Sequence, residues 1–334
     1  MDIKSVNRKQ AAGVMRFPSN SDSKYSRGTV ALAVGSDKYP GAAVLCANGA
    51  ILSGAGYVRY YGSERCSNMV LISRPETVLG AGKADAWVVG SGVADIENDF
   101  RREFICSLIC SKTVQTDSYV AIDAGALPIF AQSVAQNAKK HSDFDSDIGN
   151  SDSKPDNKPD NGRFVITPHC GEAAKIFAQF GIDVSHEQIS AQPVDYATKL
   201  SNLLGCCVIL KGGQTVIAHE RDVFKITCST HWLATAGTGD VLAGIAGTIL
   251  AQNAQALRSG SLSLAQAASA AVWIHSVAGS IAANDEIALH KTGLIPDSGN
   301  LSSGHPISAM DVAEHIGRAM EISLTVQGNI SINS

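Results

Sequence analysis

The sequence predicts an α/β protein in which helices cover both faces of a mostly parallel sheet. Short, continuously apolar segments such as 29–34 and 119–123 each run into a loop that contains glycine, and a helix-like segment follows. This alternation is typical of buried parallel strands that are connected by helices. With 334 residues, 45% of them hydrophobic, the chain is long enough to bury a large core.

The charge and hydropathy patterns argue against several classes of partner. The formal net charge is −4, and Lys and Arg are scattered rather than gathered into a basic stripe, so we expect no nucleic-acid partner. No apolar run approaches the ~20 residues that a membrane span requires, so we expect no membrane association. Residues 1–16 lack the apolar core of a signal peptide. These observations together favour the cytoplasm.

The cysteine and histidine patterns do not indicate a metal centre. None of the eight cysteines forms a CxxC pair, and most lie within apolar runs. This placement favours buried free thiols over a disulfide or metal framework. The nine histidines show no HExxH pairing. We therefore expect no metal site built from protein side chains.

Each expected element follows from its local pattern. Strands are expected where continuous apolar runs end at a glycine or a polar side chain, and helices where apolar residues recur at helical spacing or small residues dominate. The expected strands are 29–34, 57–61, 69–73, 87–89, 119–123, 164–167, 207–210 and 216–218. The expected helices are 42–55, 100–109, a segment after Glu172, 241–251, 262–283 and 309–320.

These elements form a single expected domain, residues 24–322, with a tail at each end. Residues 1–23 are polar and Ser-rich without periodicity, which predicts a flexible tail, and 323–334 is expected to be a second tail. Residues 141–162 interrupt the pattern with Asp, Ser, Asn, Lys and Pro, and contain the repeat Lys-Pro-Asp-Asn. We interpret this segment as a disordered insertion rather than a linker between domains, because the alternation of strands and loops resumes after it.

The most informative stretch is Gly237-Thr238-Gly239-Asp240, followed by an apolar helix. The two glycines allow a sharp turn, so that free N–H groups of the first helical turn can form an anion site. A carboxylate beside such a site suits a reaction in which a hydroxyl loses its proton while it attacks a phosphoryl group. The alternative is that Asp240 or Thr238 only caps the helix.

A second glycine turn, Lys211-Gly212-Gly213-Gln214-Thr215, lies between two apolar strands. By itself this turn is typical of a hairpin. Because it lies about 25 residues before Gly237-Thr238-Gly239-Asp240, it is also a plausible second wall of a nucleotide site. The sequence contains neither GxxxxGK[ST] nor GxGxxG.

Three polar residues in apolar surroundings are further candidates. His169 follows a proline at a strand end, where ligand contacts are usual in parallel sheets, although a structural histidine is equally plausible. Asp123, also at a strand end, either orients a ligand or caps the next turn. His275 lies in the middle of an Ala-rich helix, and we interpret it as structural.

Taken together, these segments resemble the ADP/ATP-dependent (S)-NAD(P)H-hydrate dehydratases, the carbohydrate-kinase-like half of the NAD(P)H-hydrate repair system. The resemblance covers roughly residues 24–320, and the motifs occur in the same order. The matching segments are 35–43, 53–56, 86–92, 166–172, 211–215 and 233–244. The resemblance implies a ribokinase-like three-layer α-β-α sandwich.

The resemblance also implies a reaction and a set of roles. The substrate would be NADH or NADPH hydrated at C6 of the nicotinamide ring. Its hydroxyl would accept a phosphoryl group from ADP or ATP with Mg²⁺, and phosphate would then leave. Asp240 would be the catalytic base, and the amides of Gly237, Thr238 and Gly239 would form the anion hole. The nucleotide would contact Lys211, Gly212, Gly213, Gln214, Thr215 and Gly239. The hydrated dinucleotide would contact Ala42, Gly92, His169 and Asp240.

Some positions depart from the family pattern. Ser91 stands where proline is common, Gly125 where a second acid is frequent, and His231-Trp232 replaces a Gly/Asn/Pro-rich approach to the first turn. The epimerase domain that is fused to many relatives is absent, so we expect a separate NAD(P)H-hydrate epimerase as a functional partner. We also expect the protein to form a homo-oligomer. A small-molecule kinase of the same fold, acting on a hydroxymethylpyrimidine or a thiazole alcohol, and a non-catalytic nucleotide-binding module are the competing hypotheses.

Overall fold

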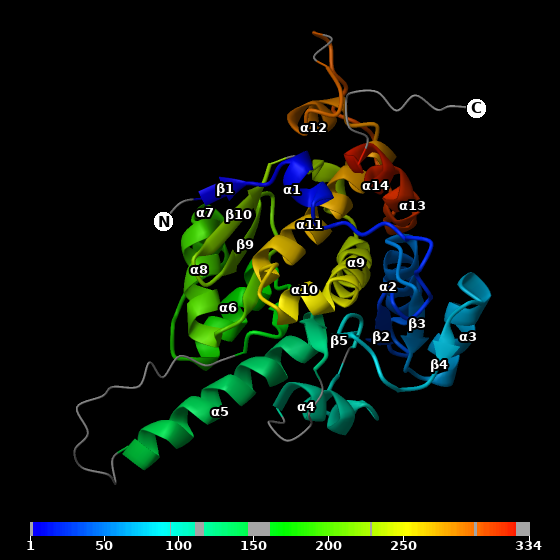
Figure 1. The fold of residues 1–334 in the computed structure, drawn as a ribbon. Helices are drawn as coiled ribbons and strands as arrows, with labels where there is room; N and C mark the ends of the chain where they lie inside the picture. Colours follow the sequence, from blue (N-terminus) through cyan, green and yellow to red (C-terminus); the bar gives the residue numbers. More distant parts are fainter. Residues whose placement is uncertain are drawn as a thin grey trace.

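The computed structural model describes residues 3–93, 95–110, 117–145, 161–227, 229–296 and 299–324. A ten-stranded sheet runs through its centre (Figure 1), in the order β1-β10-β9-β8-β7-β6-β5-β2-β3-β4. The strands are β1 Ile3–Ser5, β2 Thr29–Ala33, β3 Tyr57–Tyr60, β4 Val78–Leu79, β5 Ala86–Val89, β6 Tyr119–Ile122, β7 Phe164–Ile166, β8 Cys207–Leu210, β9 Thr215–His219 and β10 Asp222–Ile226.

The sheet is mostly parallel, as the sequence predicts. All pairs from β8 through β7, β6, β5, β2 and β3 to β4 are parallel, and only β9 is antiparallel to its two neighbours. The turn 211–214 joins β8 to β9 as a hairpin. The carboxyl ends of the parallel strands therefore meet along one edge of the sheet.

Helices cover both faces of the sheet, which confirms the three-layer α-β-α architecture. Successive residues of β2 show why, since Val30 and Leu32 enter one apolar core and Ala31 and Ala33 enter the other. On the first face lie α1 Arg8–Ala12, α2 Pro40–Leu52, α3 Glu64–Ser73, α9 Thr238–Gln252, α10 Ala254–Arg258, α11 Leu264–Ala282, α13 Ala309–Glu314 and α14 Ile316–Leu324. On the second lie α4 Arg102–Cys110, α5 Leu127–Asp145, α6 Cys170–Gln179, α7 His186–Ala191 and α8 Pro193–Leu204, while α12 Glu286–Lys291 borders α11.

Helices α2 and α9 pack backbone against backbone. A side chain at Gly244 of α9 would collide with the carbonyl oxygen of Cys46, and a side chain at Gly49 of α2 would collide with that of Val241. Glycine is required at both positions because no Cβ fits into so close an approach. The two helices therefore form one tightly joined pair under the central strands.

Helix α11 is an exception to the expectation that no apolar segment approaches the length of a membrane span. Its 19 residues are long and apolar enough to cross a membrane by length and composition alone, and 89% of that window is buried inside the protein. It packs against α9 and the strands β8 to β10 as a core helix. The cysteine expectation holds for Cys46, Cys66, Cys206 and Cys207, which are buried free thiols.

Two predictions about elements are wrong, and further elements were missed. Residues 69–73 belong to helix α3 rather than to a strand: Ser63 caps this helix by accepting a hydrogen bond from the Cys66 amide, and Cys66 and Val70, four residues apart, bury the same side. The expected helix 309–320 is divided at His315 into α13 and α14. Strand β10 was not expected at all.

The N-terminal segment also differs from the expected flexible tail. Residues 3–5 form β1, which pairs in parallel with β10, and Val6, Ala11, Val14 and Met15 are buried in the first core. These few apolar residues do not recur at a regular helix or strand spacing, so the sequence alone did not reveal that they cover the sheet edge and α11. The structure thus assigns 3–15 to the domain.

The remaining boundaries are only partly described. Helix α5 continues to Asp145, so the first part of the expected insertion 141–162 is helical; residues 146–160 lie outside the described residues. Helix α14 extends to Leu324 and buries Ser323, slightly beyond the expected boundary at 322. Residues 325–334 also lie outside the described part of the chain.

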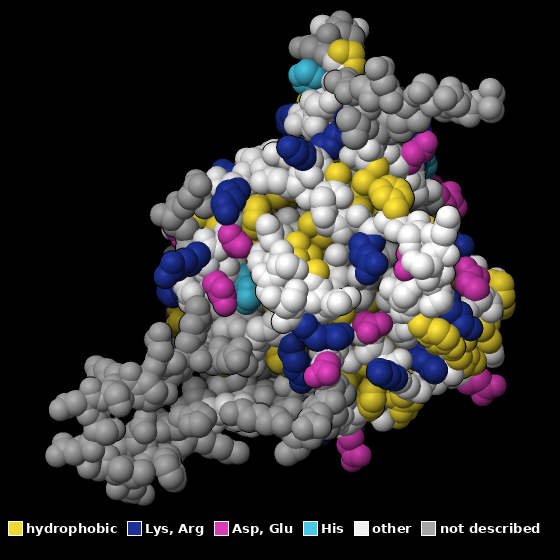
Figure 2. Space-filling view, in the orientation of Figure 1, with side chains coloured by type: hydrophobic (Ala, Val, Ile, Leu, Met, Phe, Trp, Pro, Cys, Tyr) yellow, Lys and Arg dark blue, Asp and Glu magenta, His cyan; other side chains and the backbone are white. Residues whose placement is uncertain are grey.

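The surface carries mixed charges. Figure 2 shows Lys and Arg interspersed with Asp and Glu on the face that it presents, and hydrophobic side chains gathered over α3 and β4 at the right-hand edge. The exposed side chains of Met69, Ile72 and Leu79 belong to these two elements.

Candidate active site

The candidate active site lies at the carboxyl ends of the parallel strands, next to the N-terminus of α9. Ligands usually bind at this edge of an α/β sheet, because the loops that leave neighbouring strands meet there. Glycines or polar side chains follow five adjacent strands: Gly35 after β2, Gly90–Gly92 after β5, Asp123 after β6, Thr167 after β7 and Lys211 after β8. The sheet thereby gathers residues that are far apart in the sequence.

The predicted anion site is a rigid turn with a free amide. Gly237 precedes α9 with a φ of 92°, and a side chain there would meet Leu45 Cδ1 at 2.5 Å, so the turn requires glycine. The Thr238 hydroxyl donates to the carbonyls of Leu233 and Thr235, each at 2.9 Å. The Gly239 amide finds no backbone acceptor in the described part of the chain. This amide and the helix dipole can therefore bind an anion.

The capping alternative for this turn is wrong. Among the residues that the structure describes, no side chain accepts a hydrogen bond from the first amides of α9. The Thr238 hydroxyl is instead engaged with carbonyls of the preceding turn. The amides of Thr238 and Asp240 donate to the carbonyls of Thr235 at 3.4 Å and Gly237 at 3.1 Å, so the Gly239 amide between them is the one left for a ligand.

Asp240 lies in the first turn of α9, where its carboxylate is half-buried. The Ser91 hydroxyl donates a hydrogen bond to Asp240 Oδ1. Burial raises the pKa of Asp240, and the nearby charge of Asp123 raises it further, while the Ser91 hydrogen bond and the Lys211 charge oppose the increase. A carboxylate with a raised pKa beside an anion site is suited to accept a proton.

Lys211 forms a largely buried ion pair with Asp123. Its Nζ lies 2.8 Å from Asp123 Oδ1, and the Thr167 hydroxyl donates to the same oxygen at 2.6 Å. Burial lowers the pKa of Lys211, but the charges of Asp123 and Glu172 outweigh this and raise it overall. Lys211 Nζ is also 3.4 Å from the position that a side chain on Gly239 would occupy. A fixed positive charge thus stands beside the anion turn.

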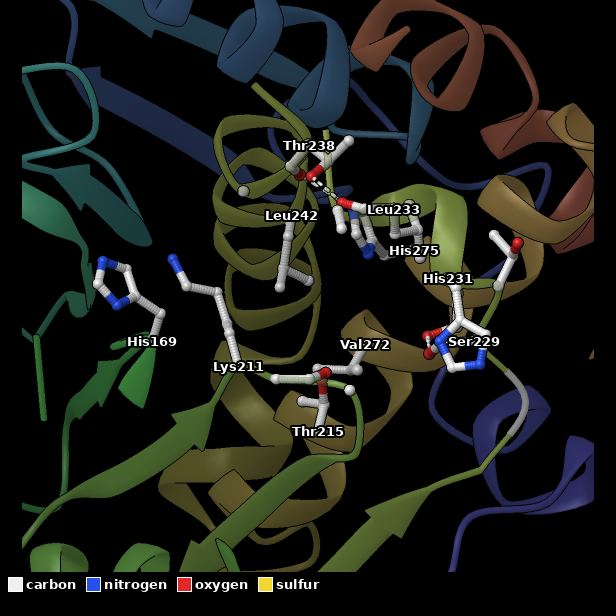
Figure 3. Close-up of a pocket in the computed structure, with 16 residues that line it drawn as sticks. His169, Lys211, Thr215, Ser229, His231, Leu233, Thr238, Leu242, Val272 and His275 are labelled. Carbon is white, nitrogen blue, oxygen red and sulfur yellow. Dashed lines mark hydrogen bonds between the residues drawn. The ribbon is translucent and has the colours of Figure 1, made fainter. Parts of the chain in front are cut away.

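A cavity of about 350 Å³ opens between the two glycine turns. Figure 3 shows His169 and Lys211 on one side of it and Ser229 and His231 on the other. The lining residues are His169, Lys211, Gly212, Gly213, Thr215, Ser229, Thr230, His231, Leu233, Ala234, Thr238, Gly239, Leu242, Val272, His275 and Ser276. Of the predicted nucleotide contacts, only Gln214 is not among them, and its side chain is exposed.

The residues predicted to contact the hydrated dinucleotide fall into two groups. Gly92 packs directly on the Ala42 methyl, since a side chain on Gly92 would collide with it. Next to Gly92, Ser91 reaches Asp240. His169 instead lies on the cavity beside Lys211, to which its backbone is paired.

His169 also has a structural role. Its Nδ1 accepts hydrogen bonds from the amides of Gly171 and Glu172 at 3.0 and 3.3 Å, so the imidazole caps α6. The ring is nevertheless 60% exposed, and its Nε2 lies 3.6 Å from Glu172 Oε2.

These features coincide with a family pattern over most of the chain. Residues 30–297 match the family model described as NAD(P)H-hydrate dehydratase. The chain belongs to the NAD(P)H-hydrate dehydratase family.

Curated relatives of this family resemble the chain over most of its length. The bifunctional NAD(P)H-hydrate repair enzyme Nnr of Mycobacterium leprae is 30% identical over 325 residues, covering 96% of this chain and 56% of the relative. The ADP-dependent (S)-NAD(P)H-hydrate dehydratase of Neisseria meningitidis is 28% identical over 294 residues, covering 82% and 86%. The chain spans about half the length of the bifunctional relatives that it matches.

Solved structures show the same fold. The ADP/ATP-dependent NAD(P)H-hydrate dehydratase of Bacillus subtilis, co-crystallised with ATP/Mg²⁺, gives a TM-score of 0.68 at 21% identity, over 96% of this chain and 99% of that one. A ribokinase-like superfamily protein of Enterococcus faecalis also gives 0.68, at 20% identity and 96% coverage of both chains. The ribokinase-like fold expected from the sequence is thereby confirmed.

Sequence reasoning missed several contacts within this dehydratase-family site. Ser91 was noted only as a departure from proline, and Thr167 was not singled out as a site residue. His275, interpreted as structural, lines the cavity, and its Nε2 lies 2.9 Å from the Thr238 carbonyl. Burial lowers its pKa to about 4, so the ring is neutral near pH 7 and donates to this carbonyl. Ser91 and Thr167 both follow the end of a strand, and this position is the signal that could have identified them.

The described residues contain no group of three or more His, Cys, Asp and Glu side chains arranged to hold a metal ion. Oxygen donors are nevertheless present at the anion turn, in the carboxylates of Asp123 and Asp240. Each of these carboxylates is already engaged by a protein donor, so an Mg²⁺ ion, which prefers oxygen ligands and keeps several of its waters, would be bound by nucleotide phosphates and water.

Proposed function

We propose that this protein dehydrates the S epimer of NAD(P)H hydrate back to NAD(P)H at the expense of ADP or ATP. The observation that carries this proposal is the placement of Asp240, Lys211 and the Gly237–Gly239 turn around one point. A base, a fixed cation and free amide donors are the groups required to transfer a phosphoryl group to an alcohol.

In the proposed first step, Asp240 accepts the proton of the C6 hydroxyl as that oxygen attacks the terminal phosphorus of the nucleotide. The bond from this phosphorus to the bridging oxygen breaks, and the nucleotide leaves with one phosphate fewer. The turn amides and Lys211 stabilise the negative charge that is transferred. The substrate hydroxyl would enter past the Ala42–Gly92 contact, which adjoins Ser91 and Asp240.

In the second step, the C6–O bond breaks and phosphate leaves while the neighbouring ring carbon loses a proton. This restores the dihydronicotinamide double bond, so the net reaction is dehydration coupled to nucleotide hydrolysis. Relatives from Neisseria and Bacillus are named ADP-dependent and ADP/ATP-dependent NAD(P)H-hydrate dehydratases, which supports the dehydration and the dependence on adenine nucleotides.

The nucleotide is proposed to occupy the cavity between the turns 211–215 and 229–239. Mg²⁺ would enter with the nucleotide and neutralise phosphate charge, with phosphate oxygens and water as its ligands. Co-crystallisation of the Bacillus relative with ATP/Mg²⁺ supports this assignment. We also propose a cytoplasmic location, a homo-oligomeric assembly and cooperation with a separate NAD(P)H-hydrate epimerase, since bifunctional relatives are named repair enzymes.

The test is to incubate the full chain with NADHX, Mg²⁺ and either ADP or ATP. The absorbance of reduced nicotinamide should return, and free phosphate should appear in equal amount. Asp240→Asn should abolish turnover while calorimetry still shows nucleotide binding, because the amide keeps the shape and loses the basic oxygen. Unimpaired turnover in this variant would overturn the role of Asp240.

The same assay separates the competing functions. A stable phosphoester without NADH would instead identify a small-molecule kinase. Nucleotide binding without consumption of any of these substrates would identify a binding module. The hydroxyethylthiazole kinase of Pyrococcus horikoshii shares the fold, with a TM-score of 0.52 at 13% identity, and this likeness concerns the fold alone.

A further inference from the structure

Ser91 is buried completely, yet its hydroxyl reaches the candidate base. Its relative exposure is 0%, and its carbonyl accepts a hydrogen bond from the Gly35 amide at 2.7 Å. The following turn is closed by a bond of 3.0 Å from the Val93 amide to the Gly90 carbonyl. The side chain is therefore fixed between the ends of β2 and β5, with its donor directed at Asp240 Oδ1.

The two oxygens of Asp240 have different surroundings. Oδ1 accepts the Ser91 bond, whereas Oδ2 lies 3.9 Å from the position that a side chain on Gly237 would occupy. Oδ2 thus faces the anion turn, where the substrate hydroxyl is proposed to bind. A carboxylate held at one oxygen presents the other in a fixed direction.

Other titratable groups surround Asp240. Asp123 at the end of β6 and Lys211 at the end of β8 carry opposite charges that partly cancel at this carboxylate. From α2, the Cys46 thiol has a pKa raised by burial. From α11, His275 has its pKa lowered by burial to about 4. Near neutral pH both are uncharged, so Ser91 and Lys211 are the groups described here that favour the ionised carboxylate.

We propose that Ser91 is a positioning residue that keeps Asp240 ionised and turned toward the anion turn. The kinetic consequence rests on the proposed function, whereas the effect on the carboxylate itself does not. Hydrogen bonds to charged groups are strong enough to change a pKa by about one to two units. Losing the donor should therefore make Asp240 harder to ionise.

The first test is the pH profile of kcat in Ser91→Ala. The acidic limb should move about one to two units toward higher pH, and kcat should recover to within about tenfold of the wild type above the new limb. Ser91→Cys, which keeps a weaker donor, should give an intermediate shift. A uniform loss of kcat at every pH, with the limb unmoved, would overturn the proposal.

Ser118→Ala is the matched control. Ser118 is also buried and donates from its hydroxyl to a carbonyl, that of Ala84 at 2.6 Å, but it lies at the opposite end of β5 and β6. It should destabilise the protein to a similar extent and leave the limb in place. An equal shift in this control would show that the effect is not specific to Ser91.

The second test does not depend on the substrate. Carbon-detected NMR of protein labelled at aspartate carboxyls gives the titration of Asp240, assigned by its loss in Asp240→Asn. The midpoint should rise in Ser91→Ala by the same one to two units, and an unchanged midpoint in a folded variant would refute the proposal. A wild type that never converts NADHX would overturn the proposed function only, since this titration stands independently of it.

Discussion

At the scale of single residues, the site depends on charges that are held in place by polar neighbours. Lys211 does not point freely into the cavity, because Asp123 holds its Nζ and Thr167 in turn holds Asp123. This arrangement fixes a cation beside the Gly239 amide at the cost of burying two charged groups, which proteins do rarely without a functional reason. The charges of Asp123 and Lys211 oppose each other at Asp240, so Lys211 offsets only part of the rise in the pKa of Asp240.

Substitution of Lys211 by Met should weaken nucleotide binding without removing the hydrophobic part of the side chain. One charge-assisted contact to phosphate contributes about 1.5–3 kcal/mol, so the dissociation constant for ADP should rise about 10- to 100-fold. Isothermal titration calorimetry measures this directly. Lys175→Met, which changes an exposed lysine on α6, should bind ADP as the wild type does. An unchanged constant in Lys211→Met would exclude a phosphate contact.

At the scale of secondary-structure elements, helices α2 and α9 place the two halves of the substrate site. Ala42 lies in the first turn of α2 and Asp240 in the first turn of α9. Their backbones touch at Gly244, where no side chain fits. Any added volume at this contact must therefore displace one helix start relative to the other.

Gly244→Ala should lower the free energy of unfolding by about 1–3 kcal/mol through overpacking, and should reduce kcat by separating Ala42 from Asp240. Gly317→Ala is the control, because Gly317 is exposed in helix α14 and, beyond its chain neighbours and its own helix backbone, no described atom lies within 4 Å of the added methyl. This control should be neutral or more stable by up to about 1 kcal/mol, since alanine is the better helix former. Urea unfolding and steady-state kinetics check both variants. If Gly244→Ala and Gly317→Ala had the same stability and the same kcat, the contact between α2 and α9 would not be tight.

The elements also show which features a single sequence contains. Buried parallel strands are uninterrupted apolar runs, so β2, β5, β6, β7 and β8 could be located in advance. The glycine turn before Asp240 was equally visible, since few other residues allow it. The short apolar run at 69–73 was predicted as a strand although it belongs to α3, because four apolar residues in a row do not distinguish the strand period of 2 from the helix period of 3.6. The bond between Ser91 and Asp240 joins residues 149 positions apart and follows from how α9 packs under β5, which no local pattern encodes.

At the scale of the whole molecule, the N-terminal segment closes one side of the first core. Strand β1 covers the edge of the sheet at β10, and α1 packs on α11 and α14. An uncovered edge strand would present unpaired backbone groups to other chains. The segment therefore makes the three-residue β1 the outermost strand in place of the five-residue β10, which leaves fewer unpaired backbone groups exposed, and it adds buried apolar surface.

Removal of residues 1–15 should destabilise the protein and promote its aggregation. Burial of Val6, Val14 and Met15 contributes about 1.5–3 kcal/mol for each side chain, so a loss of at least about 4 kcal/mol is expected. Urea unfolding gives the loss, and light scattering during heating reports the exposed edge. A truncated protein as stable as the full chain would show that 3–15 contributes little to the fold.

The close contact of α2 with α9 has a consequence for how the protein accommodates two ligands. Because these helices cannot slide without a steric collision, we expect the distance from the proposed alcohol substrate to Asp240 to be set before anything binds. Adjustment to a nucleotide of different length would then have to come from the opposite wall, where 211–214 is a hairpin turn and 229–234 contains a short 3-10 helix, His231–Leu233. We therefore expect discrimination between di- and triphosphate to depend on those two segments, and to change by mutation while the reacting geometry stays the same.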